Sequence, residues 1–103
     1  MNEVIQNLIE RRSARHYGPR QVEPEVLDQI LLAGTYAPTG MGRQSPVIVA
    51  VQDPDTVKQL SRMNAAIMGS DGDPFYGAPT VLVVLADKNV GTYLYDGSLV
   101  MGN

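Results

Sequence analysis

The chain changes from helix to strand across residues 38–51, which read PTGMGRQSPVIVAV. Pro38 disfavours helical geometry at the residue before it, so the preceding helix must end near Tyr36 or Ala37. The polar loop that follows contains two glycines and leads into Val47–Val51, an unbroken apolar run of strand length. Such a run is typical of a strand that is covered on both faces. We therefore predict a helix, an irregular loop and a buried strand in this order.

Further elements are predicted on both sides of this stretch. Apolar residues recur at helical spacing near the N-terminus, and Pro24 suits the first position of a second helix. Asp53-Pro54 is a helix-start signal, with the aspartate as the cap. The predicted elements are a helix from Glu3 to Arg11 or Arg12, a helix from Pro24 to Tyr36 or Ala37, the strand Val47–Val51, a helix from Pro54 with Val57, Leu60, Asn64 and Ile67 on one face, the strand Val81–Leu85, and a helix after Asn89.

The composition predicts one small globular domain. The 103 residues carry a net charge of −3 and 44% of them are hydrophobic, which is not typical of a disordered chain. Mild acidity argues against a general nucleic-acid surface. The lack of cysteine excludes disulfides and thiolate metal sites, and the lone His16 has no partners at ligand spacing. No apolar run approaches the roughly 20 residues of a membrane span, and no secretory signal is visible. A cytoplasmic protein is therefore expected.

Basic residues concentrate at residues 11–15, RRSAR, which hold three of the eight basic residues of this acidic chain. Two interpretations fit the cluster. Guanidinium groups match phosphate oxygens in bidentate fashion and Ser13 adds a hydroxyl donor, so the segment suits a ligand with several negative charges. Alternatively, the cations stabilise the C-terminal end of the first helix through its dipole. Arg11 and Arg15 share a face if the helix continues, and can converge from two sides if it unwinds at Ser13.

The glycine loop also allows two interpretations. Glycines let backbone N–H groups approach a ligand, and Thr39, Arg43 and Gln44 add polar side chains. A dinucleotide-binding fingerprint is excluded, because Gly40-Met41-Gly42 follows a helix and leads into a strand. A Walker-type phosphate loop is excluded by the missing Gly-Lys-Ser/Thr ending. Taken alone, the segment is more simply a connector between a helix and a strand.

Together, these segments indicate a family. RRSARHY, a helix, APTGMGRQSP and an apolar strand resemble the flavin-dependent nitroreductase family, and MNAAIMGSDGDPFYGAPTVLVVLAD agrees with it. The resemblance covers essentially all 103 residues. It implies an α+β fold with a mainly antiparallel sheet flanked by helices, whereas the strand–helix–strand order alone would suggest a parallel pair. Because family members are longer, it also implies that residues 1–103 form the N-terminal part of a single nitroreductase-like domain.

The resemblance further implies an FMN site. The family's Arg-x-Ser-x-Arg pattern grips the phosphate and ribityl chain of FMN, and its glycine-containing loop lies against the flavin ring from the partner subunit. A glutamine of that loop and a helix asparagine also reach the flavin. Two departures concern the substrate side, since Thr39 stands where serine is usual and Ser45-Pro46-Val47 lacks a common tryptophan. The matching residues are Arg11, Ser13 and Arg15 with Arg12 adjacent, then Pro38, Thr39, Gly40 and Met41, and finally Gln44 and Asn64.

The implied activity is that of an FMN-dependent oxidoreductase, in a homodimer with the flavin site at the subunit interface. NAD(P)H would deliver hydride to flavin N5, and electrons would pass to a nitroaromatic, a quinone or a similar acceptor in ping-pong order. Neither step needs a protein nucleophile, so no residue is assigned a catalytic role. The alternatives are a flavin-binding module without turnover and a structural or interaction fragment. Because no donor for flavin N5 is identifiable, the chain alone is expected to be a poor oxidoreductase.

Overall fold

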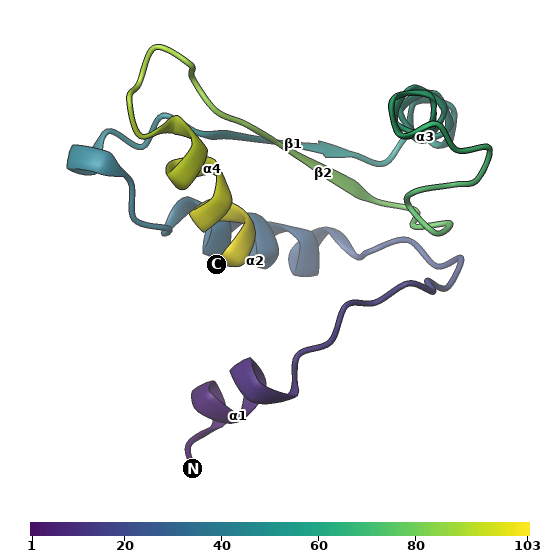
Figure 1. Cartoon of the computed structure of the whole chain (residues 1–103). Helices are drawn as coiled ribbons and strands as arrows, with labels where there is room; N and C mark the ends of the chain where they lie inside the picture. The colour runs from purple at the N-terminus through teal and green to yellow at the C-terminus, as the bar shows by residue number, and fades with distance from the viewer.

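The computed structural model describes residues 1–103 as four α-helices, one short 3-10 turn and two strands (Figure 1). The boundaries lie within a few residues of those predicted from the sequence. In chain order the elements are α1 (Glu3–Glu10), α2 (Pro24–Thr35), η1 (Gly40–Gly42), β1 (Val47–Val51), α3 (Pro54–Met68), β2 (Val81–Leu85) and α4 (Tyr93–Gly102).

The ends of the helices have local causes. The Asn2 side chain caps α1 by accepting the Ile5 N–H at 2.9 Å, and α2 begins at Pro24. Asp53 accepts both the N–H and the hydroxyl of Thr56, which caps α3 and lowers the pKa of the Asp53 carboxyl. The same helix ends at Gly69, which has a φ of 69° that an L side chain adopts only with strain. Short polar residues therefore cap the starts of α1 and α3, whereas α2 and α4 begin without a side-chain cap.

The two strands form an antiparallel pair. Val47 is opposite Leu85 and Val51 is opposite Val81. The end of β1 therefore lies beside the start of β2, and α3 with the segment after it connects the two. The antiparallel direction implied by the family resemblance is confirmed, and the parallel pair suggested by the order of elements alone is wrong. A helix between two strands does not by itself fix their direction.

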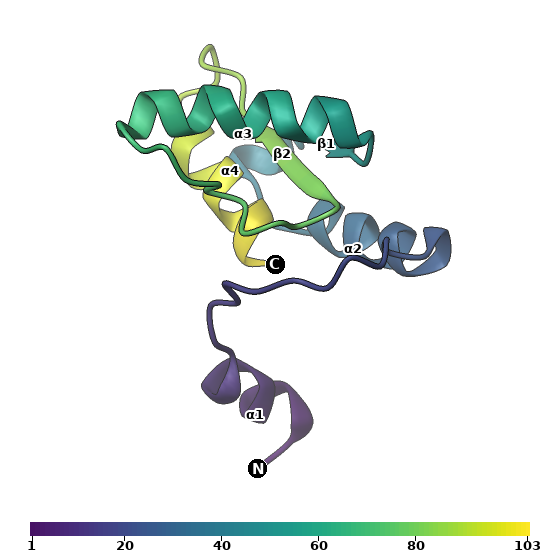
Figure 2. The same ribbon diagram turned by 90° about the vertical axis from the view of Figure 1, so that its right-hand side faces the viewer.

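The helices cover the strand pair unevenly. In Figures 1 and 2, α2 and α4 lie below the strands while α3 lies above them. The contact below is close, because a methyl group on Gly34 would come within 2.7 Å of Ile48 Cδ1 and 3.6 Å of Val100 Cγ1. Gly97 of α4 approaches β2 similarly, with Ala86 Cβ 3.4 Å from where its own Cβ would be. The small core of the chain therefore lies where α2 and α4 meet the sheet.

Much apolar surface is exposed, which corrects the predicted burial of the first strand. Val47–Val51 was predicted to be covered on both faces, but Val47 is 56% exposed because only the side toward α2 and α4 is packed. On α3 the covered positions include Leu60 and Ala65, while Ile67 of the predicted face is 85% exposed. Helix α1 buries no residue and lies apart from the remaining elements (Figure 1). No helix combines the length and apolar character needed to cross a lipid bilayer.

Candidate functional site

The arginine segment begins where α1 ends. The helix stops at Glu10, and Arg11 already has extended geometry with ψ of 135°. The Arg12 guanidinium turns back and donates to the carbonyls of Ile9 at 3.0 Å and Arg11 at 2.9 Å. Arg12 therefore has the helix-end role that the alternative interpretation gave to the whole cluster.

The other members of the cluster have no such role. Arg11, Ser13 and Arg15 are exposed and form no side-chain hydrogen bond within the chain. Since the segment is not helical, Arg11 and Arg15 do not share a helix face, and the unwound alternative applies from Arg11 onward. Two guanidinium groups and one hydroxyl are thus left available on an extended backbone.

The glycine loop is closed by its own side chains. The Thr39 hydroxyl donates to the Gln44 side-chain oxygen at 2.8 Å and accepts the Gln44 N–H at 2.9 Å. The Gln44 amide nitrogen donates in turn to the Thr35 carbonyl at 3.0 Å. These hydrogen bonds attach the loop to the end of α2. Gln44 uses its side-chain oxygen, its side-chain nitrogen and its backbone N–H to make them.

The tip of the loop has an unusual backbone. Met41 and Gln44 both lie in the left-handed region, with φ of 56° and 53°, and Gly42 has φ of 65°. Residues other than glycine adopt this geometry at a cost, so the surrounding structure must enforce it. Met41 is 89% exposed at the tip. The loop therefore presents a defined, strained apolar tip to the outside.

One residue of this region was missed by sequence reasoning. Asp96 of α4 is buried with 1% of its surface exposed, and it accepts the Gly40 N–H at 2.9 Å and the Thr92 hydroxyl at 2.8 Å. The signal was present, because Asp96 stands three positions after Tyr93 and four before Val100, on the apolar face of its helix. A charged residue on such a face indicates a buried polar contact.

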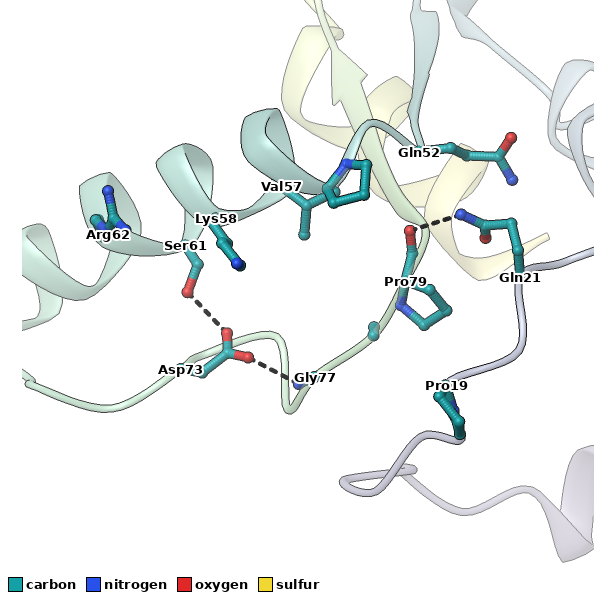
Figure 3. A pocket seen from close by; sticks show the side chains of 12 residues that line it. Pro19, Gln21, Gln52, Val57, Lys58, Ser61, Arg62, Asp73, Gly77 and Pro79 are labelled. Carbon is teal, nitrogen blue, oxygen red and sulfur yellow. Dashed lines mark hydrogen bonds between the residues drawn. The ribbon is translucent and has the colours of Figure 1, made fainter.

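Of the three main cavities of the chain, only one is lined by predicted site residues. A cavity of about 270 Å³ beside the loop includes Thr39 and Gln44 among its lining residues, together with apolar side chains such as Ile48. The largest cavity, about 570 Å³, contains none of the predicted site residues. It lies between α3, the segment before β2 and the segment before α2, as Figure 3 shows.

One wall of the larger cavity is ordered by the hydrogen bonds of Asp73. The Asp73 carboxylate accepts the Ser61 hydroxyl at 2.7 Å and the Gly77 N–H (Figure 3). It also accepts the Phe75 N–H at 2.9 Å. These bonds hold the pKa of Asp73 below its ordinary value, with the Ser61 bond the largest cause. The Gln21 amide nitrogen donates to the Pro79 carbonyl at 3.1 Å, which joins the segment before α2 to the segment before β2. The cavity joins three separate segments of the chain, so no local motif could have predicted it.

The predicted site residues do not converge within one copy of the chain. Figure 1 places the segment after α1 and the loop containing η1 at well separated positions. Asn64 is exposed on α3, away from both. The arginine segment and the loop therefore do not form one site within a single copy of the chain.

The comparisons by family pattern, by sequence and by structure all point to the same group of proteins. The pattern of the Nitroreductase family matches residues 8–73. The chain is 37% identical over 90 residues to an FMN reductase [NAD(P)H] of Bacillus subtilis, covering 86% of this chain but 34% of that protein. A nitroreductase of Bacteroides fragilis with bound FMN has a TM-score of 0.89 at 28% identity, over 99% of this chain and 62% of that one.

A second solved structure agrees. An FMN-dependent nitroreductase of Clostridium difficile has a TM-score of 0.83 at 32% identity, over 95% of this chain and 56% of that one. The chain thus spans between about a third and two thirds of the length of these three proteins. Since the family pattern matches more than half of the residues and the fold agrees, the chain belongs to the nitroreductase family.

Proposed function

We propose that residues 1–103 are the N-terminal part of a single FMN-dependent NAD(P)H oxidoreductase domain. Family membership and the FMN bound in a close structural neighbour support the cofactor. The partial span of the relatives and the uncovered apolar residues, such as Val47 and Ile67, support a domain completed by further polypeptide. The proposal rests most directly on the free guanidinium groups of Arg11 and Arg15.

The arginine segment fits the phosphate of FMN. The side chains of Arg11 and Arg15 are exposed and have no hydrogen-bond partner, whereas the Arg12 guanidinium is engaged at the end of α1. Free guanidinium groups can form paired, charge-assisted hydrogen bonds to phosphate oxygens, and the Ser13 hydroxyl is a further donor. We assign the phosphate to Arg11, Ser13 and Arg15 and give Arg12 a supporting role next to them.

The glycine loop fits the flavin ring. Pro38, Thr39, Gly40 and Met41 form a fixed backbone with an exposed thioether, and a polarisable sulfur packs well against an aromatic ring. Since the loop and the arginine segment lie far apart within one copy, we assign the loop to the flavin of a partner subunit (Figure 1). Gln44 would contribute mainly by closing the loop through Thr39 and Thr35, as its hydrogen bonds indicate.

A homodimer follows from this assignment. The exposed apolar residues of α4 offer a surface for it, with Leu94 65% and Met101 76% exposed. Asn64 of α3 is exposed, and we assign it to the same shared site. Light scattering at micromolar concentrations should find a two-fold dimer for an extended protein in which further strands cover the sheet edges. A monomer throughout that range would contradict the shared site.

The protein and the cofactor would contribute different parts of the reaction. When bound, FMN would supply the redox chemistry between NAD(P)H and a nitroaromatic, a quinone or a similar acceptor, in ping-pong order. The protein would hold the phosphate with Arg11 and Arg15 and fix the ring plane with the Gly40–Gly42 loop. No cysteine is present, and no protein nucleophile is required.

An absorbance spectrum of purified protein mixed with FMN and desalted tests the proposal. Retained flavin absorbance, bleached by NADH and restored by a quinone, would support an oxidoreductase. Flavin that is retained but not bleached would indicate a binding module instead, and a colourless protein would favour a structural or interaction fragment.

The same assay should be run on residues 1–103 and on an extended protein that supplies the remaining strands. We expect little NADH oxidation from the short chain, because it offers no identifiable donor at flavin N5. Comparable turnover by the two would show that the first 103 residues hold a complete site, against the proposal.

A further inference from the structure

Asp96 connects α4 to the glycine loop through a buried carboxylate. Taking a carboxylate out of water is costly unless hydrogen bonds compensate for it. Both oxygens of Asp96 are used, one by the Gly40 N–H and the other by the Thr92 hydroxyl. We call this contact of Gly40, Thr92 and Asp96 the Asp96 latch. Because the side chain is buried and both oxygens accept a hydrogen bond, loss of this contact would leave buried polar groups unsatisfied.

The latch is the loop's hydrogen-bonded attachment to a distant part of the chain. Asp96 lies 56 residues after Gly40, whereas the bonds of Thr39 and Gln44 span no more than 9 residues. The loop's local bonds set its shape, and the Asp96 latch sets where that shape lies relative to α4 and the sheet.

Gly40 fits the latch because it has no side chain. A Cβ at this position would come within 2.8 Å of Thr92 Cγ2 and 2.9 Å of Thr92 Cβ, closer than real Cβ atoms approach other atoms. Gly40 does not have a positive φ, so its role is this close approach rather than an unusual backbone angle. The absence of a side chain lets the Gly40 N–H reach the buried carboxylate.

The latch also bears on the strained tip. Met41 follows Gly40 directly and has a φ of 56°. A strained residue keeps its geometry only where its neighbours are fixed on both sides. The Asp96 latch fixes the N-terminal side, and the Thr39–Gln44–Thr35 hydrogen bonds fix the C-terminal side.

We infer that Asp96 is a positioning residue for the FMN site. It touches no cofactor atom itself, and it acts by holding Gly40 so that Met41 and its neighbours keep the orientation that the flavin ring requires. This inference rests on the proposed FMN function. If the loop serves the flavin of a partner subunit, Asp96 of one copy sets the ring position in the other.

The test compares Asp96→Ala with Asp96→Asn, which keeps an acceptor for the Gly40 N–H. The control is Asp28→Ala, which removes an exposed carboxylate of α2 that forms no hydrogen bond. All are made in the extended protein, and folding is checked by circular dichroism. Three quantities are measured: hydrogen exchange of the Gly40 amide without flavin, the Kd for FMN, and iodide quenching of bound-flavin fluorescence.

For Asp96→Ala we expect Gly40 exchange to be at least about tenfold faster and FMN binding about tenfold weaker, with bound flavin more open to iodide. Asp96→Asn should restore most of each value, and Asp28→Ala should match the parent. If Asp96→Ala does not fold, Thr92→Val provides a milder test, with a smaller change in the same three measurements.

A folded Asp96→Ala variant with faster Gly40 exchange but parental FMN affinity and quenching would overturn the positioning role while leaving the proposed function intact. Unchanged Gly40 exchange in that variant would overturn the latch itself. Failure of the parent protein to bind FMN would instead overturn the proposed function, and the flavin role of Asp96 with it.

Discussion

Residues 11–15 and the loop at residues 38–44 provide the two parts of the proposed site, and the fold holds them in opposite ways. The arginine segment has no regular structure, and Arg11 and Arg15 are without partners. The loop is fixed by hydrogen bonds to α2 and α4 and carries strained residues at its tip. One part is adaptable and the other is rigid.

The difference suits the two ends of an FMN molecule. A phosphate can be gripped from many directions, and long arginine side chains reach it at the cost of ordering their rotamers. A flat ring must be held in one plane, which a preorganised backbone does without further ordering. We therefore expect affinity to come mainly from the arginine segment and orientation mainly from the loop.

The sharpest test of this comparison is the double variant Arg11→Ala, Arg15→Ala. Charge-assisted contacts to phosphate contribute roughly 1.5–3 kcal/mol each, so each loss should weaken FMN binding about ten- to a hundredfold. The melting temperature should hardly change, because both side chains are exposed and unbonded. Arg20→Ala removes another exposed arginine and serves as the control. Titration of the apo protein with FMN gives the affinities, and equal values for variant and control would refute the phosphate assignment.

A second test makes the rigid part mobile. Gly40→Ala places a methyl group against Thr92, and overpacking of this kind typically costs about 1–3 kcal/mol. Urea unfolding should show that loss, and FMN binding should weaken with it. Gly91→Ala is the matched control, since nothing lies within 4 Å of its Cβ position. If the two variants unfolded alike, the loop would be looser than the structure indicates.

A third test relaxes the strained tip. Met41→Gly removes the cost of a φ of 56°, but glycine adds entropy to the unfolded chain, so the net gain in unfolding free energy should be only about 0.5 kcal/mol. Arg43→Gly, at a φ of −71°, has no strain to relieve and should lose stability instead. The sign of the difference between the two variants in thermal unfolding is the measurement. A loss for both would mean that strain at Met41 is negligible.

The smallest expected effect is at Asp73, which lies outside both the arginine segment and the glycine loop. Hydrogen bonds in the folded state lower the pKa of Asp73 below its ordinary value of 3.8. The carboxylate therefore stabilises the fold above the unfolded pKa, and this contribution disappears as the pH falls through the lower folded value. Asp73→Asn should unfold more easily than the parent at pH 7, and the gap should narrow below about pH 4. The exposed Asp71, which forms no hydrogen bond, provides the control Asp71→Asn. A gap independent of pH would exclude the charge as its cause.

Local sequence signals predicted the elements well. Capping residues such as Asp53 and the apolar runs at Val47–Val51 and Val81–Leu85 act over a few residues, and the structure confirms the elements they indicate. The direction of the strand pair came only from the family resemblance, because nothing in either strand encodes which way its partner runs.

Tertiary features were predicted less well. Ile67 was placed on one face of α3 with Val57 and Leu60, but periodicity states which residues share a face and not whether anything packs on it, and Ile67 is 85% exposed. The role of Asp96 could not be predicted because its partner Gly40 lies 56 residues away. Of the candidate site, the sequence indicated the arginine segment and the loop, and only the structure separated Arg12 from Arg11 and Arg15.

The strand pair has a consequence for how this chain must be handled. β1 and β2 pair only with each other, so each has one edge whose backbone N–H and C=O groups lack a strand partner. Open edges can pair with strands of other molecules. The half-exposed side chains of Val47 and Leu85 add apolar surface that favours such association. Until another strand covers these edges, neighbouring copies would join through them into open-ended aggregates rather than closed dimers. Concentration during synthesis and purification would then decide which assembly forms.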